Sequence, residues 1–213
     1  MIGDISSLVG KGIYPILDNS QAIELEKRML QIIEDEWAAM KQVGHKTSIE
    51  VLKDFQELKP LSENLSLLVL CGKGKNGGDS LLVADYVMRT MPRAQVVVLL
   101  ATNTRDELHP LTEKALKEVE ERVSLYEWTK DSGKSILDRL IQNEFGEKAA
   151  INICVDGLLG LGYKPPLKES LSEIISLVNE SERIEVRISV DIPTGLSESQ
   201  IEDELYFKSD LCY

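Results

Sequence analysis

Residues 65–80 read LSLLVLCGKGKNGGDS, an apolar run followed directly by a turn that contains four glycines, one asparagine and one aspartate. The apolar part is typical of a buried strand, and the glycines permit a tight turn into a helix. Such a turn directs backbone N–H groups towards a small charged ligand. Asp79 adds a carboxylate where a loop for a bare phosphate would avoid one, so the sequence indicates a different ligand.

Outward from this stretch, apolar strands alternate with helices. The predicted strands are 65–70, 95–101, 124–128, 149–155 and 186–190, and the predicted helices between them are 79–90, 110–122, 133–145 and 167–182. The strands are nearly continuous apolar runs, which is typical of a parallel sheet covered on both faces. We therefore predict an α/β fold of three layers (α/β/α), Rossmann-like, with a doubly wound, mainly parallel sheet of strand order 3-2-1-4-5. Residues 205–212 predict a further edge strand.

An N-terminal helical layer is predicted before the first strand. From residue 21 to residue 43, apolar side chains recur at helical spacing. We predict one helix here, with Asn19 or Ser20 as its N-cap and Gly44 as its stop. A second, short helix is predicted over residues 48–57.

Length and composition fit one globular domain. The chain has 213 residues, of which 43% are hydrophobic and 28% are charged, so a sizeable core is expected and wholesale disorder is not. We predict a single domain over residues 1–213, with helices at 16–60 and a Rossmann-like core at 65–213.

The charge and the cysteines indicate the compartment and the class of partner. A formal net charge of −12 argues against nucleic acid or an anionic membrane as a partner, because both attract basic surfaces. No apolar run approaches the roughly 20 residues of a membrane helix, and the N-terminus has no secretory pattern. Cys71 and Cys154 fall in apolar strands, and Cys212 makes the number of cysteines odd. Reduced thiols in a cytoplasmic protein are therefore expected.

Three strand ends carry the unusual polar residues. In the predicted order the first, fourth and fifth strands are neighbours, and ligands bind beyond the carboxyl ends of such strands. The segments that follow them are 72–79 (GKGKNGGD), 155–162 (VDGLLGLG) and 190–195 (VDIPTG). We expect three carboxylates to meet there in one cleft, with the neutral oxygens of one Asn and one Thr. These residues are Asp79, Asp156, Asp191, Asn76 and Thr194.

The first of these loops is ambiguous by itself. Gly72, Gly74 and Gly77 satisfy the G-x-G-x-x-G pattern of dinucleotide-binding proteins. The second strand is not followed by an acid for a ribose hydroxyl, and Lys75 is not followed by the Ser or Thr of a phosphate-binding P-loop. A plain tight turn between strand and helix is the structural alternative.

The gathered carboxylates predict a cation. Like charges in one cleft repel each other unless a cation or a raised pKa relieves them. A monovalent or divalent cation bound by oxygens would do so, and Asn76 and Thr194 supply neutral oxygens. Taken singly, Asp156 or Asp191 is better interpreted as a cap of the turn that follows it. Together, beside the Asn-Gly-Gly-Asp sequence, they favour a site.

With these three loops in view, the chain resembles the YjeF N-terminal domain family, whose enzymatic members are NAD(P)H-hydrate epimerases. The family motifs are Asn-Asn-Gly-Gly-Asp-Gly, Asp-Ala-Leu-Phe-Gly-Thr-Gly and Asp-Ile-Pro-Ser-Gly. Their counterparts here are 75–80 (KNGGDS), 156–162 (DGLLGLG) and 191–195 (DIPTG). The order and the spacing of the motifs agree from about residue 16 to residue 213.

The resemblance implies roles for individual residues. Asn76, Asp156 and Thr194 match positions that hold a potassium ion. The residues that match positions in contact with the hydrated dinucleotide are Lys75, Asn76, Gly77, Gly78, Asp79, Gly160, Leu161, Gly162, Tyr163, Lys164 and Asp191. Asp191 or Asp156 would act as the catalytic carboxyl group in the interconversion of the R and S forms of NADHX and NADPHX. A homodimer, and a separate dehydratase that uses the product, are also implied.

Three departures from the family pattern keep a second function open. Lys75 stands where the family has Asn, Leu161 stands where it has Thr, and the sequence ends at Tyr213, before a further family segment that carries a Lys. These departures favour a non-enzymatic nucleotide-binding or scaffold module on the same fold. The retained potassium positions and the Asn-Gly-Gly-Asp sequence favour the epimerase, which is our prediction.

Overall fold

The computed structural model describes residues 18–29, 33–102, 105–129, 135–147, 149–196 and 205–213. The chain divides into two compact units, Met1–Trp37 and Ala38–Tyr213. The single domain predicted over 1–213, with helices at 16–60 and a core at 65–213, stays a prediction. None of the helices in the described ranges is long and apolar enough to cross a membrane.

In the first unit, helix α2 (Asn19–Met29) begins directly after Asp18. The Asp18 carboxylate accepts hydrogen bonds from the Gln21 amide at 2.8 Å and from the Ser20 hydroxyl at 2.7 Å. Asp18 is therefore the N-cap, and the prediction of Asn19 or Ser20 in this role is wrong.

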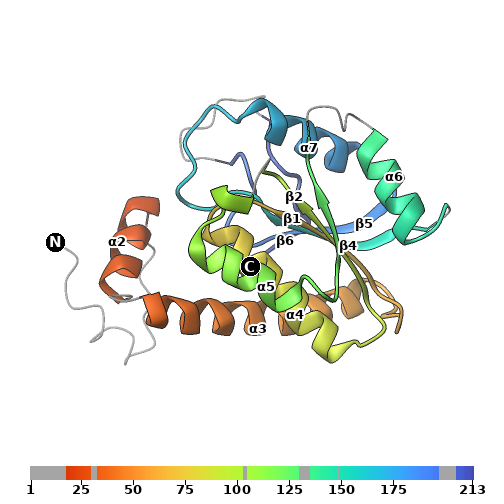
Figure 1. The fold of residues 1–213 in the computed structure, drawn as a ribbon, viewed down its shortest axis with the longest axis horizontal. Coiled ribbons are helices and arrows are strands. Elements are labelled where there is room, and N and C mark those ends of the chain that lie inside the picture. Colours follow the sequence, from red (N-terminus) through yellow and green to blue (C-terminus); the bar gives the residue numbers. More distant parts are fainter. Residues whose placement is uncertain (1–17, 30–32, 103–104, 130–134, 148, 197–204) are drawn as a thin grey trace. The chain divides into compact units, whose positions relative to one another are not determined.

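The second unit is built on a six-stranded sheet of order β3-β2-β1-β4-β5-β6, in which every neighbouring pair is parallel (Figure 1). The strands are β1 (Ser66–Cys71), β2 (Gln95–Leu100), β3 (Ser124–Glu127), β4 (Ile151–Gly157), β5 (Ile184–Ser189) and β6 (Leu211–Cys212). The predicted order of the first five strands is confirmed. The C-terminal tail adds the edge strand β6, also as predicted.

Helices cover both faces of this sheet. They are α3 (Ile33–Leu58), α4 (Lys75–Thr90), α5 (Pro110–Val119), α6 (Ser135–Glu144) and α7 (Glu169–Glu180), with a short 3₁₀ turn η1 (Arg105–Glu107). Helices α3, α4 and α5 lie on one face, and α6 and α7 lie on the other (Figure 1). This is the predicted three-layer α/β/α, Rossmann-like arrangement.

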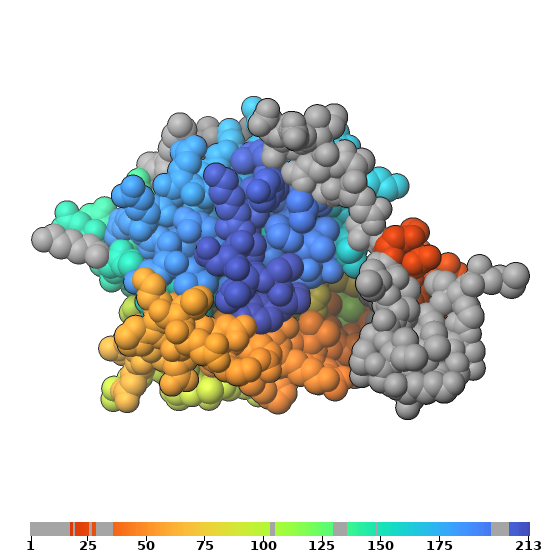
Figure 2. Space-filling view, turned by 180° about the vertical axis from the view of Figure 1, so that it is seen from behind, coloured from red at the N-terminus to blue at the C-terminus, as the bar shows by residue number. Residues whose placement is uncertain are grey.

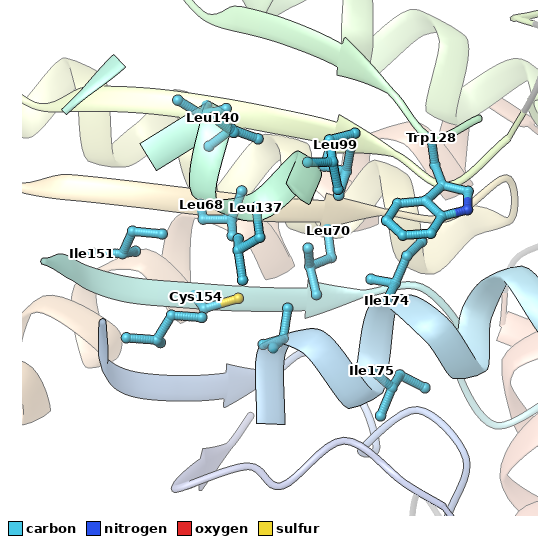
Figure 3. Close-up of a cluster of buried hydrophobic side chains, with 14 of the residues drawn as sticks. Leu68, Leu70, Leu99, Trp128, Leu137, Leu140, Ile151, Cys154, Ile174 and Ile175 are labelled. Atoms are coloured by element: carbon cyan, nitrogen blue, oxygen red, sulfur yellow. The ribbon is translucent and has the colours of Figure 1, made fainter. Parts of the chain in front are cut away.

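The main apolar cluster lies between the sheet and helices α6 and α7 (Figure 3). Leu68 and Leu70 of β1 point into this cluster, and Leu67 and Val69 lie on the opposite face because side chains alternate along a strand. All of these leucine and valine side chains are fully buried. Both faces of β1 are therefore covered, which explains its unbroken apolar sequence.

The cysteines have the states that their positions in the sequence indicate. Cys71 and Cys154 are buried free thiols within the sheet, and Cys212 is an exposed free thiol in β6. Burial raises the pKa of Cys71 to about 12, so this thiol stays protonated at neutral pH.

Helix α3 continues through Gly44, so the predicted stop at Gly44 and the separate helix over 48–57 are wrong. Gly44 is buried, and a Cβ atom on it would lie only 2.6 Å from Cβ of Leu82 in α4. Gly78 of α4 similarly leaves room for Met40, because a Cβ atom on Gly78 would lie only 3.0 Å from the Met40 sulfur. Glycine is needed here for close helix packing, a tertiary cause that the local pattern does not contain.

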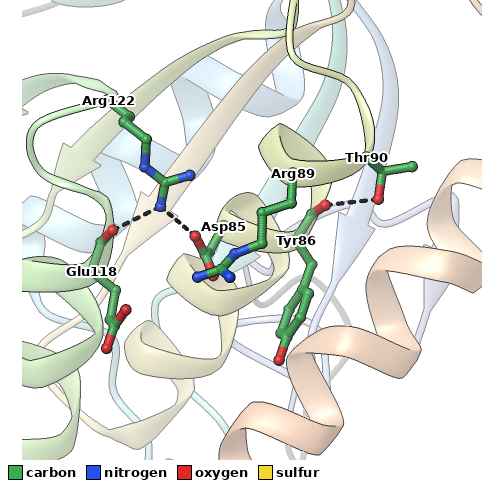
Figure 4. A network of polar contacts seen from close by, with 6 residues as sticks. All are labelled: Asp85, Tyr86, Arg89, Thr90, Glu118 and Arg122. Carbon is green, nitrogen blue, oxygen red and sulfur yellow. Dashed lines mark hydrogen bonds and ion pairs between the residues drawn. The ribbon is translucent and has the colours of Figure 1, made fainter.

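A buried carboxylate joins α4 to the end of α5 (Figure 4). Asp85 accepts a hydrogen bond from Nε of Arg89 at 2.8 Å and a second one from Arg122, which also donates to the carbonyl oxygen of Glu118. Two guanidinium groups therefore satisfy this buried carboxylate with charge-assisted hydrogen bonds. The network fixes the two helices to each other.

Candidate active site

Three loops meet at the carboxyl end of the sheet, as the strand order predicts. In the parallel register, Asp156 of β4 is paired with Leu70 of β1 on one side and with Ser189 of β5 on the other. Asn76 lies in the first turn of α4, which follows β1, and Thr194 follows β5. The side chains of Asn76, Asp156 and Thr194, with the backbone of Leu159, form what we call the Asp156 cluster.

Asp156 is fully buried and accepts four hydrogen bonds. Thr194 donates two of them, from its hydroxyl at 2.7 Å and from its backbone N–H at 2.8 Å. The backbone N–H of Leu158 and the hydroxyl of Ser189 donate the other two, both at 3.1 Å. Burial raises the pKa of Asp156 to about 6, and the hydrogen bonds from Thr194 act in the opposite direction.

Asn76 has one satisfied and one unsatisfied end. Its Nδ2 donates to the carbonyl oxygen of Leu159 at 2.8 Å, and the Leu159 N–H donates to the Thr194 hydroxyl at 3.0 Å. The carbonyl oxygen of Leu159 can only accept a hydrogen bond, so Nδ2 of Asn76 must face it. Oδ1 of Asn76 therefore points away from this carbonyl oxygen. That oxygen is buried and has no hydrogen-bond partner in the described structure. Such an orphan acceptor costs about 1–3 kcal/mol unless a ligand binds it.

The chemistry of the Asp156 cluster suits a hard cation. It combines an amide oxygen, a carboxylate, a hydroxyl and a backbone carbonyl, and it contains no nitrogen or sulfur ligand. Oxygen donors of this kind suit alkali and alkaline-earth cations. Among the described residues there is no group of three or more His, Cys, Asp or Glu side chains that could hold a metal ion.

Asp191 lies beside this cluster in a different environment. It is exposed, it has φ of 72°, and its Oδ2 accepts the backbone N–H of Leu161 at 2.7 Å. A Cβ atom on Gly160 would lie 2.6 Å from this oxygen and 3.5 Å from Cγ of Asn76. The glycine therefore lets the Asp191 carboxylate approach the Asp156 cluster closely.

Apart from Asp191, the predicted substrate-binding residues fall in two segments. Helix α4 begins at Lys75, four residues before the predicted start, so Asn76, Gly77 and Gly78 lie in its first turn and Asp79 follows directly after it. Gly77 is required there, because a Cβ atom on it would lie 2.1 Å from the carbonyl oxygen of Gly72.

The second segment is a turn over residues 160–164 next to Asp191. The N–H of Tyr163 donates to the carbonyl oxygen of Gly160 at 2.9 Å and closes the turn. Leu161 and Tyr163 are half-buried, and Gly162 and Lys164 are exposed. Asp79 is half-buried, and its predicted meeting with the two other carboxylates stays a prediction.

Two contributors to the site were missed in the sequence. Ser189 donates to Asp156, and the signal for it was available, because Ser189 ends the strand that pairs with β4. Leu159 contributes only its backbone N–H and carbonyl oxygen, so its residue type carries no signal.

This arrangement defines a class of protein: a Rossmann-like α/β protein with an oxygen-lined site and an exposed aspartate at the carboxyl edge of its sheet. The family model described as YjeF-related protein N-terminus matches residues 28–212. The chain therefore belongs to this family, as its three motifs predicted.

Named relatives agree with this membership, and a solved structure shares the fold. The chain is 30% identical to an NAD(P)H-hydrate epimerase of Rhodopirellula baltica over 72% of its own length and 57% of the relative. It is also 30% identical to an NAD(P)H-hydrate epimerase of Elusimicrobium minutum, over 84% of its own length and 75% of the relative. Proteins named bifunctional NAD(P)H-hydrate repair enzyme Nnr match over 21% to 30% of their length. The crystal structure of the yeast protein ynu0 shares the fold, with a TM-score of 0.66 at 20% identity over 88% of this chain and 77% of the yeast chain.

Proposed function

We propose that this protein is an NAD(P)H-hydrate epimerase, which interconverts the R and S forms of NADHX and NADPHX in the repair of nicotinamide nucleotides. Family membership and the names of the two bacterial relatives support this activity. The structural observation that carries the proposal is the approach of both Asp191 and Asn76 to the position that a Cβ atom on Gly160 would fill. The oxygen donors proposed for a cation and a carboxylate that a ligand can reach are therefore adjacent.

A potassium ion is the cation proposed for the Asp156 cluster. Oδ1 of Asn76, the carboxylate of Asp156 and the hydroxyl of Thr194 would hold it. The ion would give the buried Oδ1 of Asn76 a partner and would balance the buried charge of Asp156. When bound, it supplies positive charge that allows the diphosphate of a dinucleotide to lie near acidic side chains.

Epimerisation needs a group that moves a proton at the substrate hydroxyl. The stereocentre is C6 of the hydrated nicotinamide ring, where the C–O bond must break and re-form on the opposite face. Protonated Asp191 would donate to the hydroxyl so that water departs, and its carboxylate would then stabilise the cationic ring. Water adds to the other face of the ring and returns a proton to Asp191.

Asp191 suits this role better than Asp156, the other candidate. Asp156 is fully buried, so a dinucleotide cannot contact its oxygens. Asp191 is exposed, and the backbone N–H of Leu161 holds one of its oxygens at 2.7 Å. A substrate can reach the second carboxylate and not the first, so Asp156 is assigned to the ion.

The dinucleotide would lie between the first turn of α4 and the turn over residues 160–164. Amide groups at a helix N-terminus favour negatively charged groups such as a diphosphate. Lys75 and Lys164 bring positive charge to these two segments of a chain with a net charge of −12. The same argument applies to NADHX and to NADPHX.

The finer assignments follow from the same proposal. We propose a homodimer in the cytoplasm, without a nucleic-acid or membrane partner, and a separate dehydratase that uses the S epimer. The bifunctional names of several relatives support the association of this family with a second repair activity.

The direct test is the conversion of purified (R)-NADHX to the S form, followed by HPLC or NMR in a potassium buffer. We expect conversion well above the spontaneous rate. A folded protein that binds NADH yet gives no acceleration would contradict the proposal. Such a protein would match the alternative, a nucleotide-binding module without catalysis, which the substitutions at Lys75 and Leu161 favour.

A further inference from the structure

The backbone of Asp191 is held in an unusual conformation by the last residues of the chain. Its φ of 72° lies in the left-handed region, which Asp tolerates better than most residues but which needs support. The N–H of Asp191 donates to the carbonyl oxygen of Tyr213 at 2.7 Å, and the Cys212 thiol lies 3.1 Å from the Asp191 carbonyl oxygen. The N–H of Tyr213 donates in turn to the carbonyl oxygen of Ser189 at 3.0 Å. Strand β6 and Tyr213, the residue that follows it, therefore fix the backbone of Asp191.

Tyr213 is itself anchored to a distant helix. Its hydroxyl donates to Oδ2 of Asp54 in α3 at 2.6 Å. Figure 2 shows the C-terminal residues (dark blue) reaching the surface of α3 (orange). Both side chains are half-buried, and burial together with this hydrogen bond raises the pKa of Tyr213, so the phenol remains a donor at neutral pH. A hydrogen bond from a phenol to a carboxylate is charge-assisted and stronger than a neutral one.

These contacts form one continuous path from α3 to the site. Asp54 fixes the ring of Tyr213, the Tyr213 carbonyl fixes the backbone of Asp191, and the Asp191 carboxylate meets the Leu161 N–H. The backbone of Ser189 holds Tyr213 while its hydroxyl reaches Asp156. The position of Tyr213 therefore affects the hydrogen bonds that hold both Asp191 and Asp156 in place.

We propose that Tyr213, anchored by Asp54, is a positioning residue that sets the orientation of the Asp191 carboxylate. This inference rests on the proposed function only where it takes Asp191 to be the group that moves the proton. A misplacement of about 1 Å at a reacting group is enough to lower turnover strongly. The anchor thus acts through Asp191 and touches no substrate.

Tyr213→Phe is the test variant, because it removes only the hydroxyl group. We expect kcat to fall about tenfold while KM for (R)-NADHX changes less than about twofold. Asp54→Asn is expected to lower kcat in the same direction, and the double variant is expected to fall no further than the more damaged single variant. Tyr206→Phe, in the same C-terminal segment and 40% exposed, is the matched control and should leave kcat unchanged.

Combining Tyr213→Phe with Asp191→Asn distinguishes a positioning role of Tyr213 from a role in the stability of the fold alone. If Tyr213 acts through Asp191, Tyr213→Phe has no further effect on the residual rate of Asp191→Asn. A general loss of folding would lower that residual rate as well and would overturn the inference.

The NMR signal of the Leu161 amide gives a readout that needs no turnover. Because this amide donates to Asp191, Tyr213→Phe should shift its resonance in the direction in which Asp191→Asn shifts it, and Tyr206→Phe should not. An unmoved Leu161 resonance, or an unchanged kcat in an active enzyme, would overturn the positioning role. A shifted resonance in a wild-type protein without epimerase activity would uphold the anchor and overturn the proposed function instead.

Discussion

Asp156 lies near the end of β4 and Asp191 follows the neighbouring strand β5, yet the two side chains lie in opposite environments. Asp156 is fully buried, accepts four hydrogen bonds and has its pKa raised to about 6. Asp191 is exposed, has a positive φ and holds one oxygen against the Leu161 amide. The difference separates two tasks for one residue type. An enclosed carboxylate can hold an ion, and an exposed one can meet a substrate.

The largest expected effect is that of Asp191→Asn on turnover. Asn has the same size and also tolerates the left-handed region, but it has no acidic proton to donate. We expect kcat to fall about 10²–10⁴-fold, the usual contribution of a positioned general acid. The Tm and its dependence on potassium should stay at their wild-type values. Undiminished turnover in the HPLC assay would remove Asp191 from the mechanism.

In contrast to Asp191→Asn, the variant Asp156→Asn should lower the stability of the fold. The amide NH₂ of Asn would face the N–H and O–H donors that the carboxylate now accepts, so at least one buried donor would lose its partner. We expect the free energy of unfolding to fall by about 2–3 kcal/mol in urea titrations. Asp106→Asn, at an exposed aspartate, is the control and should change it by less than about 0.5 kcal/mol. Equal stability of the two variants would contradict the contrast between the carboxylates.

Asn76→Ala tests the ion-binding half of the contrast. It removes the orphan Oδ1 and should reduce the potassium-dependent gain in the free energy of unfolding by about 1–2 kcal/mol. Asn179→Ala is the matched control, because it removes a side-chain amide that donates a hydrogen bond to the carbonyl oxygen of Tyr206. This control should keep the full potassium effect in thermal unfolding. A full potassium effect in Asn76→Ala would show that the ion binds elsewhere.

The smallest predicted effect is a pH dependence of potassium binding. The folded pKa of Asp156, about 6, lies above its ordinary value of 3.8, so without potassium the folded protein loses stability as pH rises through this window. Potassium competes with the proton, so its stabilising effect is full above this window and is lost as pH falls. We expect the apparent potassium affinity to fall about tenfold per pH unit below pH 6. An equal potassium effect on Tm at about pH 5 and about pH 7.5 would contradict this competition.

Much of this site could be predicted because it depends on strand ends. The parallel order places the carboxyl ends of β1, β4 and β5 together, so three motifs far apart in sequence had to meet. That argument placed Asn76, Asp156 and Thr194 in one cluster, which the hydrogen bonds confirm. The binding of an ion and of substrate at these residues stays a prediction.

The rest could not be predicted because it depends on tertiary packing. Gly44 has the local features of a helix stop, and only the approach of Leu82 shows why a glycine is needed inside α3. The difference between Asp156 and Asp191 is equally invisible in sequence, since both follow apolar strands and precede turns. The anchor of Tyr213 joins residues 159 positions apart, a contact that no local pattern specifies.

The most direct measurement is the rate of (R)-NADHX epimerisation by the wild-type protein with potassium and with choline in its place. The same samples should be followed by thermal unfolding, so that ion binding and turnover are compared in one preparation. We predict fast conversion to the S form with potassium, a strongly reduced rate with choline and a higher Tm with potassium. A rate equal to the spontaneous one in both buffers, from a folded protein, would contradict the account.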